Sequence, residues 1–326
     1  GDEIITSPIT DIGTIIPIIY QNCIPIFADI EPYTWNMDAA DLERKITEKT
    51  KAIIVVHLFG NAADMDAIME VAKRHNIPVI EDCSQAHRST YKGKLLGTIG
   101  EIGCFSLQQS KHMTTGDGGM TITDNDDYGA RGTFFVDKGW QRGLPGARQY
   151  IMLGMNYRMT ELQAAVGIAQ LGKVEQVTNL RNRNGDLLTE LISDVNGITT
   201  QGVIEGSKHT YWQYGFTVDP DANFTADQFS QALSKEGISS GAHYIGKPIF
   251  LCQQALVNKT IFGDSHHPFD LPSARKNIEY VEGLCPVTED ILNRMVTVSI
   301  SQFLEEEDVL DIAKGIRKVA EGLAKK

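Results

Sequence analysis

The chain has 326 residues, of which 42% are apolar and 22% are charged, a balance typical of folded globular proteins. Its 30 basic and 42 acidic residues give a net charge of −12, so we expect no nucleic-acid partner. No apolar stretch reaches the roughly 18 residues that a transmembrane helix needs, and we expect no membrane partner. The length predicts about two domains, which we place at residues 1–175 and 176–326.

The cysteines and the start of the chain bear on its compartment. Five cysteines lie far apart and form no CxxC pair, which predicts neither a disulfide framework nor a zinc site. No charged segment followed by an apolar run opens the chain, so we expect no secretory signal and a cytoplasmic location. The cysteines are Cys23, Cys83, Cys104, Cys252 and Cys285.

The first half of the chain alternates short apolar strands with helices, which are predicted over Asp38–Ile46 and Asp64–His75. Apolar residues between Met65 and Ala72 repeat at the spacing of one helical face, and Asp64 can cap the first turn. This alternation predicts a mostly parallel sheet with helices on both faces. The expected strands are Glu3–Thr6, Ile24–Ala28, Ala52–Leu58, Ile77–Glu81, Cys104–Leu107 and Met120–Thr123.

The second half begins with a long predicted helix from about Thr160 to Ile192, with a break near Gly172. It would join a smaller unit in which strands and helices are mixed without strict alternation, the pattern of an α+β domain. The expected strands of that unit are Tyr211–Val218, Ile238–His243 and Met295–Ser301, and the expected helices are Ala226–Glu236 and Glu305–Leu323.

Two polar segments follow strands of the predicted parallel sheet, where ligands collect. Asp82 and Gln85 come after one strand, and Lys111 leaves another into a glycine-rich loop, with Ser106 and Ser110 as hydroxyls for a phosphate. Pyridoxal phosphate needs a lysine for its Schiff base and an acid beside its ring nitrogen. The residues alone suggest such a site, although a strand-end acid and a solvated lysine are also ordinary features.

Other motifs do not predict a site. Gly241–Lys247 resembles a P-loop, but Pro248 replaces the residue that binds Mg²⁺. The glycines from Gly97 to Gly103 precede a strand, so the fingerprint of a nucleotide-dependent oxidoreductase is absent. His266 and His267 have no ligand spacing around them, and we expect no metal site.

Four ordered segments resemble the pyridoxal-phosphate-dependent sugar aminotransferases of DegT/DnrJ/StrS type: Glu81–Ala86, Phe105–Ser106 with Lys111, Gly116–Gly119, and Asn156–Ala165. The likeness extends from Gly1 into the C-terminal domain, including Gly241–Tyr244. It implies the fold-type-I transferase architecture: an α/β large domain with a mostly parallel sheet, lacking its N-terminal part, and a smaller α+β C-terminal domain.

The resemblance also implies roles for particular residues. Lys111 would form the Schiff base and shuttle the proton, while Asp82 would pair with the pyridinium nitrogen. Gln85 would hydrogen-bond the O3′ side of the ring, and Ser106 would bind the phosphate. Asn156 would reach the phosphate in the neighbouring subunit, so the active unit would be a homodimer with shared sites.

The implied reaction moves an amino group from glutamate or glutamine to a nucleotide-linked keto sugar or to a keto cyclitol. His87, His243 and Tyr244 would face this substrate. A sugar dehydratase of the same fold, which carries histidine at the lysine position, is an alternative because His112 follows Lys111. A non-catalytic regulatory member of the family is another.

Three departures from the family pattern stand out. Relatives carry a further segment before the strand at Glu3, including a loop that cups the phosphate, so we expect the chain alone to bind the cofactor weakly or not at all. Asp11 lies where many members have an aromatic residue stacked on the ring. His87 and Arg88 replace a small Gly-Ala pair and would narrow the pocket or contact an acidic group of the substrate.

Overall fold

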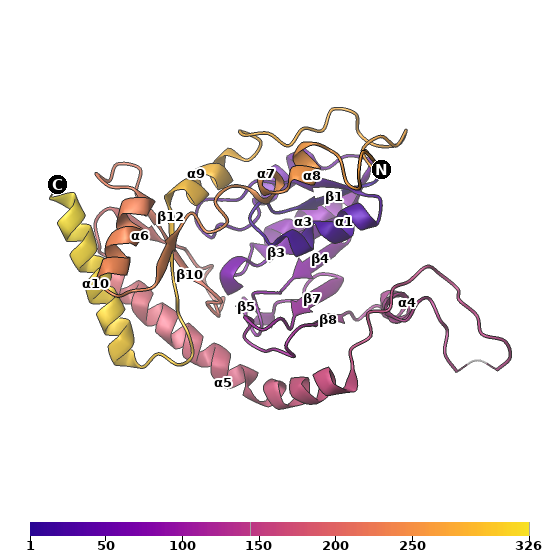
Figure 1. Cartoon of the computed structure of the whole chain (residues 1–326), viewed down its shortest axis with the longest axis horizontal. Coiled ribbons are helices and arrows are strands. Elements are labelled where there is room, and N and C mark those ends of the chain that lie inside the picture. The colour runs from indigo at the N-terminus through magenta and orange to yellow at the C-terminus, as the bar shows by residue number, and fades with distance from the viewer. Residues whose placement is uncertain (144, 326) are drawn as a thin grey trace.

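A six-stranded sheet in the order β2-β1-β3-β4-β7-β8 organises the first half of the computed structural model, which describes residues 1–143 and 145–325 (Figure 1). Neighbours from β2 to β7 run parallel, and the edge strand β8 is antiparallel to β7. The predicted mostly parallel sheet is therefore confirmed. Its strands are β1 Glu3–Thr6, β2 Ile24–Phe27, β3 Thr50–Val56, β4 Val79–Asp82, β7 Ile102–Ser106 and β8 Gly119–Ile122.

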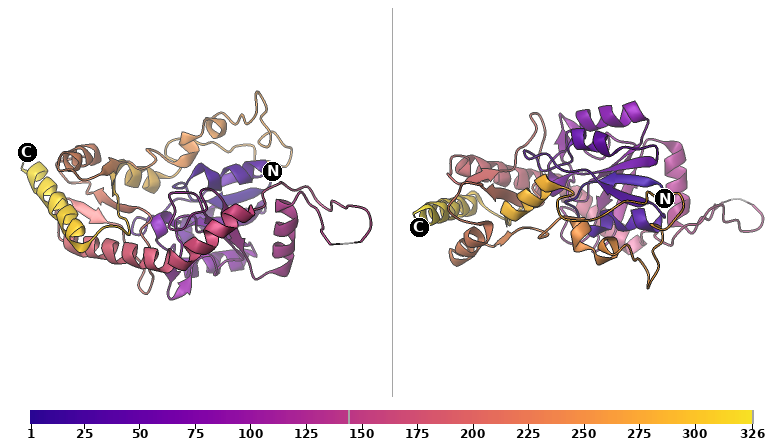
Figure 2. Two further views of the ribbon diagram at one scale, coloured as in Figure 1. Left: turned by 60° about the horizontal axis from the view of Figure 1, so that its bottom comes forward. Right: turned by 90° about the horizontal axis from the view of Figure 1, so that it is seen from above.

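Helices cover both faces of this sheet (Figure 2). The crossovers before and after β3 are α2 and α3, which lie on one face, and α1 lies on the other, as right-handed connections require. Asp64 caps α3 as expected, and Asn76 ends it in the left-handed conformation. The bounds are α1 Ile16–Tyr20, α2 Ala39–Lys45 and α3 Met65–His75, with short 3-10 helices η1 Ile12–Thr14 and η2 Leu58–Gly60 and a small hairpin of β5 Thr90–Tyr91 and β6 Lys94–Leu95.

An arm projects from the molecule between β8 and the long helix (Figure 1). It follows α4 (Asp126–Val136), which the sequence patterns did not predict, and runs from about 137 to 157. Bridges join Asp137 to Asn156 and Trp140 to Tyr150, so the two sides of the arm pair as a hairpin does.

The long helix α5 runs from Glu161 to Ile192 without the break expected near Gly172. Thr160 and Gln163 form a capping box at its start, which satisfies backbone groups that the first turn leaves free. A Cβ added at Gly172 would meet open space, and the glycine keeps helical geometry because the hydrogen bonds of a long helix continue on both sides.

A second, antiparallel sheet follows, in the order β11-β12-β10-β9, and α6 and α10 pack on it. All three strands predicted for this sheet are shorter than expected. β10 begins after Tyr211 and β11 ends before His243, because both residues have positive φ, and β12 ends at Val298 instead of Ser301. The elements are β9 Ile198–Thr200, β10 Tyr214–Val218, α6 Ala226–Lys235, β11 Ser240–Ala242, β12 Met295–Val298 and α10 Glu306–Ala324.

The segment between these strands returns to the first sheet. Phe250 and Tyr280 are buried beside Phe27 of β2, in the same apolar core as the strands of the large sheet. A division of the chain at residue 175 therefore needs an exception for this segment. It contains α7 Ile249–Cys252 and α8 Gln254–Val257, and α9 Pro286–Arg294 follows it. None of the helices described is long and apolar enough to cross a bilayer.

Candidate active site

A cavity of about 660 Å³ opens where three parallel strands of the large sheet end. Its lining includes the last residue of each: Val56 of β3, Asp82 of β4 and Ser106 of β7. Gln85, Ser110 and Lys111 also line it. The edge at which the carboxyl ends of the strands meet thus gathers five predicted site residues, Asp82, Gln85, Ser106, Ser110 and Lys111, in one place.

The carboxylate of Asp82 is fixed by two hydrogen bonds. Thr14 Oγ1 of η1 donates to Oδ2 at 2.7 Å, and the amide of Ser84 donates to Oδ1 at 3.0 Å. Thr14 also shares a hydrogen bond of 2.6 Å with Thr10 Oγ1. These contacts hold a negative charge at one position in the cavity wall, as a partner for a cationic ring nitrogen must be held.

Lys111 lies against the indole of Trp212, with its Nζ 4.2 Å from the ring centroid. Burial lowers the pKa of the Lys111 amine, and the charges of Asp11 and Asp82 oppose that shift without cancelling it. A lysine with a lowered pKa is more often neutral, which is the form that attacks an aldehyde or accepts a proton. Trp212 itself is held by a hydrogen bond of 2.9 Å from Nε1 to the carbonyl of Ser110.

The remaining polar side chains of the cavity wall differ in which hydrogen-bonding atoms they leave available to a ligand. Gln85 Oε1 accepts from the amide of Phe59 at 2.7 Å, so its Nε2 is left to donate, at 3.4 Å to the hydroxyl of Tyr244. Ser106 Oγ accepts from the amide of Gln108 at 3.3 Å and keeps its own proton to donate. Ser110 Oγ instead donates to Gln108 Oε1 at 2.7 Å.

The other predicted site residues lie outside the cavity lining as far as the structure describes it. Asn156 is exposed on the arm, where its Oδ1 accepts from Arg158 at 3.1 Å. His243 contacts Asp227 Oδ2 of α6 at 3.0 Å and the carbonyl of Leu292 of α9 at 3.2 Å, which engages both of its ring nitrogens. Tyr244 is half-buried, and the loss of water around its hydroxyl raises its pKa to about 12.

Two histidines behind the cavity wall are buried. The His87 side chain is only 5% exposed, and its ring packs against Phe105 and His112. His112 Nε2 is 2.9 Å from the carbonyl of Thr210. Lys111 lines the cavity and His112 does not. Of these two adjacent residues, it is therefore the lysine whose side chain reaches the cavity.

Sequence reasoning missed Thr14 and Trp212 as parts of the site. Thr14 follows the Asp11 cap of a three-residue helix, and Trp212 lies about a hundred residues after Lys111. Asp11 also lines the cavity, while its Oδ1 accepts from the amide of Gly13 at 2.8 Å. Periodicity carries no signal for such contacts.

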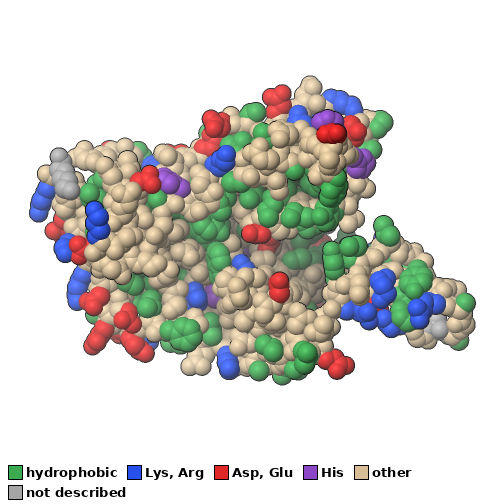
Figure 3. Space-filling view, in the orientation of Figure 1, with side chains coloured by type: hydrophobic (Ala, Val, Ile, Leu, Met, Phe, Trp, Pro, Cys, Tyr) green, Lys and Arg blue, Asp and Glu red, His purple; other side chains and the backbone are tan. Residues whose placement is uncertain are grey.

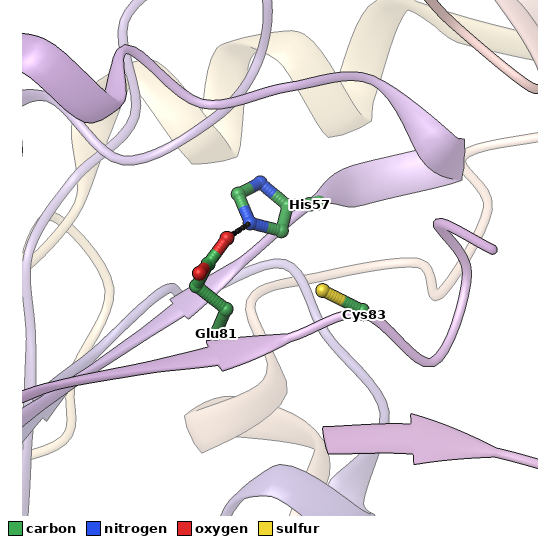
Figure 4. A group of neighbouring side chains, drawn as sticks. All are labelled: His57, Glu81 and Cys83. Atoms are coloured by element: carbon green, nitrogen blue, oxygen red, sulfur yellow. Dashed lines mark hydrogen bonds and ion pairs between the residues drawn. The ribbon is translucent and has the colours of Figure 1, made fainter. Parts of the chain in front are cut away.

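A buried group of His57, Glu81 and Cys83 has the composition of a metal site (Figure 4). The Glu81 oxygens, however, already accept four hydrogen bonds: from His57 Nε2 at 3.1 Å and from the amides of Gly97, Ile99 and Gly100 at 2.7 Å each. Burial alone would raise the Glu81 pKa, but His57 and these amides hold it below its usual value. The Glu81 carboxylate is thus engaged in holding the loop before β7, and we assign no metal to this group of three residues.

Comparison with known proteins agrees with this geometry. The pattern of the DegT/DnrJ/EryC1/StrS aminotransferase family matches residues 1–260. The chain belongs to this family. It is 38% identical over 252 residues to a GDP-perosamine synthase of Caulobacter vibrioides, covering 77% of this chain and 66% of that protein. It is 32% identical over 336 residues to an L-glutamine:2-deoxy-scyllo-inosose aminotransferase of Streptoalloteichus tenebrarius, covering 98% and 76%.

The fold of this aminotransferase-family chain is shared with solved structures. An aminotransferase from Psychrobacter cryohalolentis superposes with a TM-score of 0.84 at 28% identity, over 99% of this chain and 82% of that one. The chain spans 57–79% of the length of the curated relatives to which it is similar. Their names include both a nucleotide-linked sugar and a cyclitol, and the family therefore fixes the class of reaction more closely than the substrate.

Proposed function

We propose that this chain is a pyridoxal-phosphate-dependent aminotransferase that moves an amino group from glutamate or glutamine to the keto group of a sugar or cyclitol. The observation that carries the proposal is the placement of Lys111 and Asp82 in the wall of one cavity at the strand ends. The named relatives support both kinds of acceptor.

The donor set of the cavity fits the cofactor. Lys111 offers an amine whose pKa is lowered, Asp82 offers a fixed carboxylate, and Ser106 keeps a hydroxyl proton to donate. Pyridoxal phosphate, when bound, supplies an electron sink that allows the bond to the α-hydrogen of the amino donor to break.

The residues of the chain then have separate tasks. Lys111 would hold the cofactor through its amine and would also carry a proton at Nζ. Asp82, held by Thr14, would keep a proton on the ring nitrogen, and Gln85 would help to hold the ring through its free Nε2 donor. Apolar side chains, among them Ile54, Val56 and Ile80, also line the cavity and would reduce the access of water to these groups.

We also propose a homodimer with shared sites, to which Asn156 contributes from the arm. The first half of α5 exposes large apolar side chains, with Leu162 83% and Ile168 76% exposed. Leu153 and Tyr157 of the arm, which precede α5 in the sequence, are exposed as well. Apolar side chains clustered in this way are typical of a protein interface.

A cytoplasmic location completes the proposal. Its five cysteines are free, as in proteins of reducing compartments, and its net charge of −12 disfavours nucleic acid as a partner. The substrate partners would be the keto acceptor and the amino donor.

The decisive experiment uses the visible absorbance of lysine-bound cofactor. We expect the full-length protein to show this band, Lys111→Ala to lose it, and the surface variant Lys314→Ala to keep it. Borohydride should attach the cofactor permanently to Lys111, which peptide mass spectrometry would locate, and glutamate or glutamine should bleach the band. A band of full strength in Lys111→Ala refutes the lysine assignment, and a band that no amino donor bleaches favours the dehydratase or regulatory alternative.

A further inference from the structure

The loop that carries Lys111 is bonded, on both sides of the lysine, to one short segment between β9 and β10. Trp212 Nε1 donates to the carbonyl of Ser110 at 2.9 Å, and His112 Nε2 lies 2.9 Å from the carbonyl of Thr210. A carbonyl oxygen can only accept, so the ring nitrogen of His112 is the donor. The residues immediately before and after Lys111 are therefore attached to the same segment.

That segment, residues 209–212, is itself fixed to the large sheet, and we name it the bracket. The amide of Thr210 donates to the carbonyl of Gly60 at 3.2 Å, and the amide of Trp212 donates to the carbonyl of Phe59 at 2.7 Å. Both acceptors lie in η2, which follows β3. The bracket therefore connects the loop of the lysine to the end of a neighbouring strand.

Arg181 of α5 attaches the bracket to the second sheet as well. Its side chain is half-buried, and its Nη1 donates to the carbonyls of Tyr211 at 3.0 Å, Trp212 at 3.3 Å and Ile300 at 2.7 Å. Ile300 follows β12, so one guanidinium joins three parts of the fold. Hydrogen bonds from a charged donor are among the stronger ones in proteins, and they leave the backbone of the bracket little freedom.

Two residues of this arrangement have strained backbones. Tyr211 has a φ of 45° and Phe59 a φ of 61°, in the left-handed region that bulky residues seldom adopt. Such strain persists only where the surrounding contacts require it, and it is common at functional sites. At Tyr211 it accompanies the divergence of two successive rings. The Tyr211 ring is buried and stacks on His209, with 3.7 Å between the ring centroids, whereas Trp212 lines the cavity.

At the cavity the Trp212 ring lies against the lysine. Lys111 Nζ is 4.2 Å from the ring centroid, within the range in which an aromatic face attracts a cation. Asp11 and Asp82 act on the same amine, and His87 behind the wall is neutral near pH 7 because burial lowers its pKa to about 4. Figure 3 shows the surface hollowed near the centre of the view, beside α1, with acidic and basic side chains at the edge of the hollow. The ring and the two carboxylates therefore favour the ammonium form of the lysine, against the burial that disfavours it.

We propose that Trp212 is a positioning residue for Lys111: its indole N–H fixes the loop at Ser110, and its ring face holds the ammonium form of the lysine at the cavity wall. The inference rests on the proposed function, because it concerns the lysine that would hold the cofactor. One side chain thus acts on the backbone next to the lysine and on its charged end. Through the bracket, this contact joins the lysine to α5 and to the second sheet.

Hydrogen exchange tests the role of the indole N–H in the full-length protein without cofactor. Trp212→Phe keeps an aromatic ring but removes the donor to Ser110. The amides of Lys111 and Thr115, which donate within the loop at 3.0 and 2.9 Å, should then exchange about fivefold faster than in the wild type, as the loss of one hydrogen bond predicts. Tyr128→Leu, at an exposed position of α4, is the control and should exchange as the wild type does. Equal exchange in Trp212→Phe and the wild type would overturn this role.

The ring face is tested by the pKa of Lys111 in the same cofactor-free protein. Trace acetic anhydride labels only the neutral amine, and mass spectrometry of the Lys111 peptide follows the labelling as a function of pH. Trp212→Phe and Trp212→Leu both lack the indole N–H and both shorten the side chain, but only phenylalanine offers an aromatic face. The pKa of Lys111 should be about 0.5 to 1 lower in Trp212→Leu than in Trp212→Phe. Equal values or the opposite order would overturn the role of the ring.

Neither measurement depends on bound cofactor, so the two proposals fail separately. Circular dichroism verifies that both Trp212 variants are folded, and exchange in the conservative Trp212→Phe tests the bracket even if Trp212→Leu does not fold. A wild type that shows no visible band when pyridoxal phosphate is added would refute the proposed function and would leave the two results on Trp212 unchanged.

Discussion

Replacing Glu81 by glutamine tests how the loop before β7 is held. The two oxygens of Glu81 accept four hydrogen bonds in a fully buried site, three from the backbone of the loop at 97–100 and one from His57. His57 Nδ1 accepts from the amide of Ala63 at 3.3 Å, so the proton of the ring lies on Nε2 and points to Glu81. Glutamine has almost the same shape, and the substitution therefore changes hydrogen bonding more than packing.

The cost follows from counting acceptors. Glutamine keeps one oxygen, which can accept two of the four hydrogen bonds, and presents an NH₂ group to the other two donors. Each buried donor left without an acceptor costs about 1–3 kcal/mol, so Glu81→Gln should lower the free energy of unfolding by about 2–6 kcal/mol. That is a large part of the roughly 5–15 kcal/mol by which a domain is stable.

Urea unfolding at pH 7, followed by tryptophan fluorescence and circular dichroism, measures this change. Glu289→Gln is the matched control, because among the residues that the structure describes its two oxygens accept only from the amide of Gly283 at the surface, at 2.7 and 3.0 Å. We expect the control to lose less than about 1 kcal/mol, since water replaces the lost acceptor. If Glu81→Gln is destabilised no more than the control, the loop is not held by this carboxylate and the reasoning fails.

Three further perturbations test the site and the fold. Thr14→Val removes the hydroxyl that donates to Asp82 and should weaken cofactor binding roughly tenfold in a titration of the visible band; an unchanged affinity would show that Thr14 does not position Asp82. Burial, followed by the charge of a nearby lysine, lowers the pKa of His87 to about 4 from 6.5, so the unfolded chain binds more protons between these values. The wild type should therefore lose about 3 kcal/mol from this group as pH falls from 6.5 to 4, and His87→Gln should show a correspondingly smaller loss in urea unfolding; equal losses would contradict the burial of His87. Gly185→Ala on α5 would place a methyl group against the buried ring of Tyr211 and lower the free energy of unfolding by about 1–3 kcal/mol. Gly172→Ala on the same helix meets open space and should raise the free energy of unfolding by up to about 1 kcal/mol. Thermal unfolding of both variants separates the two effects, and equal melting temperatures would contradict them.

Short-range patterns in the sequence determined much of the six-stranded sheet and its helices. The bounds of β1 and the last residue of α3 agree with prediction, because strand and helix periodicities depend on neighbours within a few residues. The same patterns put Asp82 and Lys111 near the ends of two parallel strands. Since parallel strands end at the same edge, the sequence was enough to predict that these residues share one site.

Tertiary structure alone decided which groups surround them. Thr14 donates a hydrogen bond to Asp82, which lies 68 residues later in the chain, and Lys111 contacts Trp212, which lies 101 residues later. No local sequence pattern encodes contacts between residues so far apart in the chain. The burial of His87 likewise depends on packing, because its partners His112 and Phe105 come from a later segment. The return of residues 249–285 to the first core has the same origin: apolar side chains are buried wherever a complementary surface exists, whatever their separation along the chain.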